Sequence, residues 1–255
     1  YGRFLRERAM RLLLPFLLFG LLIVTGKYLS KFFLYVDDPP RSFLGGVRDL
    51  LIDTDKSPAL SIWYVYVLFL YSAVMPLLWR LGLRWPGAVL LGLGLFALPA
   101  PDFLYLDRAA SFFLFFAIGG LVAARPDIES WFYRLVLAWL LLFNATLFTE
   151  WTALPGQARM LLCGIAAIPA LHGLVKARFL ARERVLLTLG ENAFSIYLLN
   201  TIVIGLMKAG YLKLAPFEGA SATFALCLFF AGGVVVPILI RKVTARLPVL
   251  AWMMR

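Results

Sequence analysis

Histidine and cysteine are almost absent from this chain. Its 255 residues include one histidine, His172, and two cysteines, Cys163 and Cys227, which both lie in apolar stretches. A zinc site or a disulfide framework needs more of these residues at characteristic spacing, so we predict neither, and we assign no metal ligand. Charged residues are also scarce, at 15% of the chain, whereas a soluble domain has about a quarter.

Apolar side chains are what the chain has in excess. They make up 62% of the residues, and the mean hydropathy is +0.87. This composition predicts an all-α, polytopic bundle of membrane helices whose first partner is the lipid bilayer. The net charge of +11 does not indicate nucleic-acid binding, because the lysines and arginines lie between apolar segments and do not form one basic face.

Eight segments are apolar enough to be interpreted as membrane spans. They cover approximately residues 11–32, 60–79, 86–104, 108–124, 133–150, 157–176, 190–211 and 221–241. The third is Gly-rich and is broken by Pro99 and Pro101. We count it as a crossing because eight spans with both termini in the cytoplasm put most of the lysines and arginines on the cytoplasmic side. If it did not cross, the basic stretch KARFLARER would have to be translocated.

One long loop, from about Lys31 to Pro58, is predicted outside the cell membrane. Within it, RSFLGGVRDLLID places its apolar residues at helical spacing on one face. We expect a short helix that lies on the outer membrane surface. It either seals the bundle or acts as a lid over an outward-facing site.

A few polar residues fall inside the predicted spans, where such groups usually face the bundle interior. They are Asn144, Ser195, Tyr197 and Asn200. Lys27, Glu150 and Lys208 lie near the outer ends of their spans, where they either snorkel to the surface or converge on an outward-facing polar pocket. His172 has no Ser, Asp or Glu near it in the sequence, so we interpret it as an interfacial residue and not as a general base.

Two further groups of residues are candidates for binding. Arg8 and Arg11 are three apart, which in an α-helix puts them on one face near its cytoplasmic start, suited to a phosphate-bearing ligand. The alternative is plain anchoring of the topology. Trp63, Tyr64 and Tyr66 begin the second span at the outer surface. They form either an aromatic belt or a surface that stacks on a sugar ring.

Three stretches, in this order, resemble the integral-membrane acyltransferase type 3 family. FLRERAMRLLLPF resembles its cytoplasmic R-x-x-R element, with Arg8, Arg11 and the early Pro15. SPALSIWYVYVLFLYSAVMPLL resembles a span that Trp63 leads, although Tyr64 and Val65 replace the usual Phe-Leu. ARERVLLTLGENAFSIYLLNTIVIG resembles a late helix of the family, which Leu189, Gly190, Phe194, Ser195, Ile196, Tyr197 and Leu198 fit. FFLFFAIGGLVAA fits a further, less specific span.

The resemblance implies transfer of an acyl group, commonly acetyl, from cytoplasmic acyl-CoA to a hydroxyl of a carbohydrate or other envelope acceptor at the inner membrane of a bacterial cell. Acyl-CoA is then a co-substrate, and no bound prosthetic group is expected. Arg8 and Arg11 would hold the CoA phosphates, and the acceptor would contact Trp63, Tyr64, Tyr66 and Glu150.

The resemblance also implies what the chain is missing. Family members have ten helices, so we expect residues 1–255 to be one acyltransferase-like domain that lacks the first two. The family's catalytic Arg and His, about ten residues apart in the first helix, have no match, and Asn200 stands where the late helix often carries a histidine. The catalytic residues are therefore unknown. A solute transporter, lined by Lys27, Glu150, Lys208 and Asn200, and a non-catalytic membrane scaffold are the alternatives, although no internal repeat supports a transporter.

Overall fold

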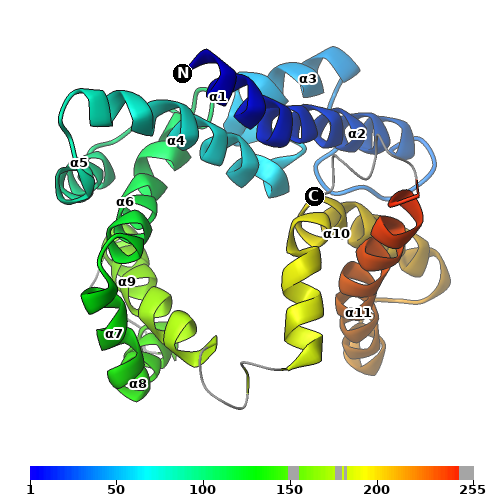
Figure 1. Cartoon of the computed structure of the whole chain (residues 1–255). Coiled ribbons are helices and arrows are strands. Elements are labelled where there is room, and N and C mark those ends of the chain that lie inside the picture. Colours follow the sequence, from blue (N-terminus) through cyan, green and yellow to red (C-terminus); the bar gives the residue numbers. More distant parts are fainter. Residues whose placement is uncertain (149–154, 176–179, 181–182, 247–255) are drawn as a thin grey trace. The chain divides into compact units, whose positions relative to one another are not determined.

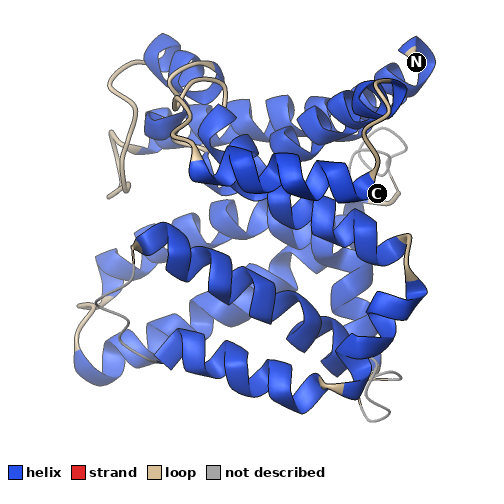
Figure 2. Cartoon of the chain, turned by 90° about the vertical axis from the view of Figure 1, so that its left-hand side faces the viewer, coloured by secondary structure: helices blue, strands red, loops and turns tan. Residues whose placement is uncertain are grey.

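The structure is a computed structural model that describes residues 1–148, 155–175, 180 and 183–246. Within these ranges every regular secondary-structure element is a helix. The only β pairing among the described residues is an isolated bridge between Asp53 and Phe103 (Figure 2). The prediction of an all-α fold is therefore confirmed. The helices form two compact units, which we describe one after the other.

Unit 1 comprises Tyr1–Leu77, Ala100–Ala109 and Leu189–Arg255, and it begins with one long helix. Helix α1 (Gly2–Arg8), a π-helical turn (Ala9–Leu13) and helix α2 (Leu14–Ser30) run on without a break over 29 residues (Figure 1). In the π turn the Leu14 N–H donates to the carbonyl five residues back. Pro15 follows directly. Its ring would crowd the carbonyl four residues earlier, which favours a widened turn at this place.

Helix α3 (Phe43–Leu51) confirms the short helix that we predicted in the long loop. The Ser42 side chain caps it by accepting a hydrogen bond of 3.0 Å from the Gly45 N–H. The helix runs antiparallel to α2 and packs closely on it. Leu50 is fully buried against Gly20, where a Cβ atom would lie 2.8 Å from its side chain. This packing is that of a helix that seals the bundle.

Unit 1 also holds most of helix α4 (Trp63–Arg80), most of α10 (Arg184–Leu214) and all of α11 (Gly219–Thr244). Helices α10 and α11 form an antiparallel pair (Figure 1). Gly233 lets Ile204 approach its backbone, and the rings of Tyr211 and Phe229 lie 5.8 Å apart. At the other end of this pair, the Arg241 guanidinium of α11 donates a hydrogen bond of 2.6 Å to the Glu191 carbonyl of α10.

Unit 2 comprises Leu78–Pro99 and Ala110–Thr188. Its elements are α5 (Trp85–Ala97), the greater part of α6 (Leu106–Ala123), α7 (Pro126–Arg134), α8 (Val136–Phe148) and α9 (Gly156–Val175). Glycines make the close contacts here as well. A Cβ at Gly120 would lie 2.2 Å from the Trp85 ring, and one at Gly164 would lie 2.3 Å from the Phe115 ring. Small residues at helix crossings are typical of membrane bundles, where close packing drives association.

Among the described residues, six helical segments are long and apolar enough to cross a membrane, or seven if α7 and α8 together count as one broken span. The chain is thus a multi-pass membrane protein. The span expected at 133–150 corresponds to α8, which meets α7 at a 75° bend near Leu135. The expected span at 86–104 is the 13-residue helix α5, about 20 Å long, which ends just before Pro99. Its crossing, the count of eight and the cytoplasmic termini stay predictions.

Candidate functional site

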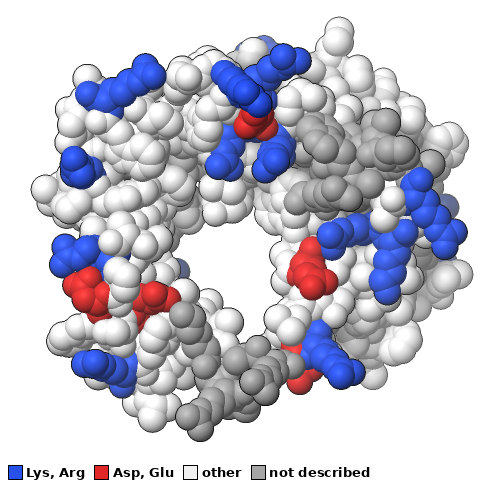
Figure 3. All heavy atoms as spheres, in the orientation of Figure 1, with Lys and Arg blue, Asp and Glu red and all other residues white. Residues whose placement is uncertain are grey.

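Three arginines and a glutamate line a hollow of about 410 Å³ at the start of the first helix. Arg3, Arg6 and Arg11 surround Glu7, with Met10 beside them. Figure 3 shows blue side chains gathered around a red one where α1 leads into α2. The Glu7 carboxylate accepts a hydrogen bond of 3.3 Å from the Arg3 Nε. Three cations around one carboxylate leave the hollow with a net positive charge.

A π turn lies between the arginines of this segment. It covers Ala9–Leu13, so it follows Arg6 and includes Arg11, and both residues line the hollow. Arg8 does not line the hollow, and its guanidinium lies 5.3 Å from the centre of the Phe4 ring. The expectation that Arg8 and Arg11 share one face assumed regular α-helix, which the turn interrupts. Their role in acyl-CoA binding stays a prediction.

The predicted aromatic residues at the start of α4 separate into two environments. The rings of Trp63 and Tyr64 lie edge to face at 5.8 Å, and Tyr64 is 45% exposed. Its N–H donates to the Tyr197 hydroxyl at 3.2 Å, so α10 contributes to the same place. The Tyr66 ring instead packs at 5.2 Å from the fully buried Phe16 ring of unit 1. Of the three aromatic residues only Tyr64 is exposed, and Trp63 and Tyr66 are both half-buried.

Arg108 is a residue that sequence reasoning missed. Its guanidinium lies 5.2 Å from the centre of the Trp63 ring, within range of a cation–π interaction. The neighbouring Asp107 carboxylate is 3.9 Å from the Arg108 Nε, and its second oxygen, Oδ1, is buried with no hydrogen-bond partner among the described residues. The signal was present in the sequence as an Asp-Arg pair directly before an apolar run. Only the fold brings it to Trp63.

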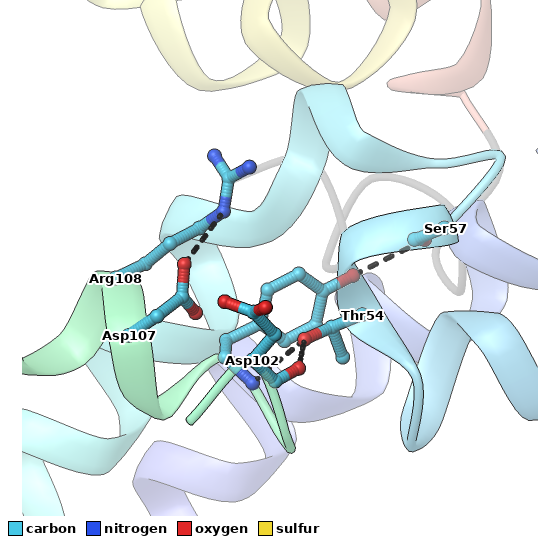
Figure 4. A network of polar contacts seen from close by, with 6 residues as sticks. Thr54, Ser57, Asp102, Asp107 and Arg108 are labelled. Atoms are coloured by element: carbon cyan, nitrogen blue, oxygen red, sulfur yellow. Dashed lines mark hydrogen bonds and ion pairs between the residues drawn. The ribbon is translucent and has the colours of Figure 1, made fainter. Parts of the chain in front are cut away.

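A hydrogen-bond network fixes the segment that directly precedes Asp107 and Arg108 (Figure 4). The Thr54 hydroxyl donates to the Asp102 carbonyl at 2.6 Å and accepts from the Tyr105 N–H at 3.0 Å. The Tyr105 hydroxyl donates to Ser57 at 3.2 Å. Burial raises the pKa of Tyr105, which therefore stays protonated and keeps this bond.

This network also holds a strained piece of backbone. Leu104 and Tyr105 have φ angles of 52° and 56°, a conformation that costs about 1–2 kcal/mol for a residue with a side chain. The bonds from Thr54 and Ser57 offset that cost. The chain thereby enters α6 at a fixed angle, and Arg108 lies in its first turn.

The polar residues that we predicted inside spans are mostly satisfied within their own helices or by direct neighbours. Asn144 donates to the Leu140 carbonyl one turn earlier, and its side chain is exposed. Asn200 accepts from Thr201 at 3.1 Å and lies against Gly233 of α11. Ser195 is almost fully buried. Of this group, only Tyr197 reaches the Trp63–Tyr64 surface.

Two of the three charged residues predicted at the outer span ends do come together. Lys27 of α2 and Lys208 of α10 line one cavity of about 310 Å³. Lys208 forms an ion pair of 2.6 Å with Asp37, whose pKa it lowers mainly by that hydrogen bond. Glu150, the third, lies outside the described residues.

His172 has a carboxylate partner that lies far from it in the sequence. Its Nε2 lies 3.1 Å from the Glu129 Oε1 and 3.0 Å from the Tyr133 hydroxyl, which also donates to that carboxylate. Both partners come from α7, about 40 residues earlier in the chain. Sequence proximity could not reveal them because the bend before α8 is what brings α7 beside α9.

Comparison with known proteins gives one match. A family model described as an acyltransferase domain matches residues 1–242, nearly the whole chain. No curated protein and no solved structure matches it. The match covers both the arginine-lined hollow and the Trp63–Arg108 surface. The chain therefore belongs to the acyltransferase type 3 family.

Proposed function

We propose that this membrane acyltransferase moves an acyl group, most simply acetyl, from cytoplasmic acyl-CoA to a hydroxyl of an envelope carbohydrate at the inner membrane. The observation that carries the proposal is the convergence of Arg3, Arg6 and Arg11 on one hollow, in a chain of an acyltransferase family. The transporter and scaffold alternatives have no comparable support.

The hollow suits the phosphates of CoA. A guanidinium offers a planar fork of N–H donors that matches two phosphate oxygens, and such charge-assisted bonds are about twice as strong as neutral ones. Glu7 orients Arg3 by accepting its Nε–H, which leaves the other two arginines for the ligand. We therefore expect Arg6 and Arg11 to contribute more to CoA binding than Arg8.

The acceptor is assigned to the surface formed by Trp63, Tyr64 and Tyr197. Aromatic rings stack on the apolar face of a sugar, and Tyr64 is exposed at this surface. The Arg108 guanidinium lies beside the Trp63 ring and can donate hydrogen bonds to the oxygens of the sugar. Tyr66 contributes packing beneath this surface, since its ring contacts Phe16 and Tyr105.

The transfer itself needs few groups. The acceptor oxygen attacks the thioester carbonyl, a C–O bond forms, the C–S bond breaks, and CoA leaves as the thiol. A base must take the hydroxyl proton. The chain's single histidine is held by Glu129 in unit 2, and we assign the base to no residue of this chain.

Calorimetry with acetyl-CoA on the purified protein tests the donor site. Because one charge-assisted bond to a partly exposed phosphate contributes about 1.4 kcal/mol, the Arg11→Gln variant should bind about tenfold more weakly. Arg8→Gln is the matched control, three residues away on the same helix, and it should change the affinity less than twofold. Equal losses of affinity in both variants would indicate that the arginines act through their general positive charge and not through specific contacts with the phosphates. Unchanged affinity in both would remove the donor site from this helix.

A further inference from the structure

We propose that the cavity between α2, the loop after it and α10 is a binding site for an amphiphile that carries a phosphate or carboxylate head on a single apolar chain. This site lies at the opposite end of the first helix from the arginine-lined hollow. It does not depend on the function proposed above.

The mouth of the cavity is polar and charged. Lys27, Lys208 and Asp37 line it, together with the hydroxyl-bearing residue Ser30. Asp37 is already paired with Lys208 at 2.6 Å. Lys27 is half-buried, and no carboxylate among the described residues lies within ion-pair distance of its Nζ. The ammonium group of Lys27 is therefore the charge left for a ligand.

The acids nearby do not remove that charge. Asp37 and Asp38 both attract Lys27, but from beyond contact distance, and Asp38 does not line the cavity. A half-buried ammonium keeps a strong need for a hydrogen-bonding anion, because its own hydration is incomplete. A ligand phosphate or carboxylate between Lys27 and Lys208 would meet that need directly.

Below the charged mouth the cavity is apolar. Leu22 and Ile23 of α2 face Ile202, Ile204 and Leu206 of α10 there. A free phosphate makes no use of such a floor, whereas an alkyl chain gains about 0.8 kcal/mol for each methylene that it buries. The volume of about 310 Å³ is at the lower end of the range for small-molecule sites, which favours one chain over two.

Two glycines of the lining allow a clean test. Gly26 and Gly205 both border the cavity, and a Cβ atom added to either would meet no atom within 4 Å. A Gly205→Leu substitution would therefore add bulk at the cavity lining, and its Cβ atom would displace no protein atom. Gly210, on the same helix, is equally open but does not line the cavity, so Gly210→Leu is the matched control for helix propensity and added bulk.

Native mass spectrometry of the full chain can measure retention of three probes: lysophosphatidic acid, lysophosphatidylcholine and glycerol 3-phosphate. We expect lysophosphatidic acid to be retained at least tenfold better than the other two. Gly205→Leu and the double variant Lys27→Gln/Lys208→Gln should each lower its retention about tenfold, and Gly210→Leu should change it less than twofold.

Three outcomes would overturn the proposal. Equal retention of the two lysolipids would show that charge is not recognised, and equal retention of glycerol 3-phosphate would show that the apolar floor plays no part. An equal loss in Gly205→Leu and Gly210→Leu would indicate nonspecific lipid at the protein surface. Thermal unfolding of each variant checks that it is folded, and this readout depends on neither proposed site.

Discussion

The two ends of the first helix hold cations around a carboxylate in opposite ways. At its start, Arg3, Arg6 and Arg11 surround Glu7 in an open hollow in which Arg3 is 94% exposed. Sixteen residues after Arg11, or about 24 Å along the helix, Lys27 lines a cavity that has an apolar floor. The first arrangement suits a water-soluble polyphosphate, and the second suits an amphiphile.

The difference shows that the kind of cation and its surroundings act together. Arginine keeps its charge in every environment and offers paired donors, so it serves an exposed site that must hold several phosphate oxygens. Lysine is a compact point charge on an apolar stem, which fits a half-buried mouth above aliphatic side chains. Net charge alone would not separate the two sites.

Charge reversal should produce the largest effect and separate the sites most fully. The Arg6→Glu/Arg11→Glu variant should lose acetyl-CoA affinity by at least a hundredfold, because two attractive contacts become repulsive ones. Retention of lysophosphatidic acid should change less than twofold. Calorimetry and native mass spectrometry on the same preparation measure both. Parallel losses in the two assays would mean that the variant has damaged the fold rather than one site.

Ionic strength should distinguish the sites next. Raising the salt concentration from about 0.05 M to 0.5 M should weaken acetyl-CoA binding about tenfold. At the higher concentration the Debye length is less than about 10 Å, so attraction between exposed charges is largely screened beyond that distance. The affinity for lysophosphatidic acid should fall less than threefold, because much of its binding energy comes from burial of the lipid's alkyl chain. A steeper salt dependence for the lipid would contradict the assignment of the apolar floor.

Glu7 offers a smaller change in the opposite direction. Replacing it with Gln removes the one negative charge of the hollow and releases Arg3 from its ion pair. Acetyl-CoA affinity should therefore rise about threefold to fivefold. Glu183→Gln, at an exposed position remote in sequence, serves as the control for the change in net charge. A fall in affinity would show that Glu7 is needed to position Arg3.

The smallest effect should come from Asp37. Its pKa is lowered, mainly by the hydrogen bond from Lys208, so its carboxylate adds stability above its ordinary pKa near 4. The Asp37→Asn variant should lose at most about 0.5 kcal/mol near pH 7, because the pair is partly exposed. The difference should disappear as the pH falls through the lowered pKa of Asp37. Thermal unfolding at pH 7 and below pH 4 compares the two proteins, and a difference that persists in acid would contradict the ion pair.

Much of the fold followed from the sequence because apolar runs of sufficient length must be helices in a membrane. The family resemblance followed from motifs around Arg8, Trp63 and Ser195, and the match over residues 1–242 confirmed it. The bend between α7 and α8 was missed because no proline or glycine marks it in the sequence around Leu135.

The candidate sites were predicted less completely, and for a physical reason. Helical spacing placed Arg8 with Arg11, but the π turn shifts the register between them, and a single turn of this kind is invisible in a hydrophobic pattern. Arg108 and the Glu129 partner of His172 come from segments about 45 residues away from the groups that they contact. Convergence of Lys27 and Lys208 was one of two alternatives in the sequence, because both lie at one depth in their spans, and the cavity that they share favours it.

The most direct test of the donor site compares acetyl-CoA with S-acetylpantetheine, which keeps the thioester and lacks every phosphate. Calorimetric competition gives the ratio of the two affinities in the wild type and in the Arg6→Gln/Arg11→Gln variant. If these arginines hold the phosphates, the preference for acetyl-CoA should fall at least tenfold in the variant, while the weak affinity for S-acetylpantetheine stays the same. An unchanged ratio would show that the phosphates bind elsewhere, and it would contradict the assignment of the hollow.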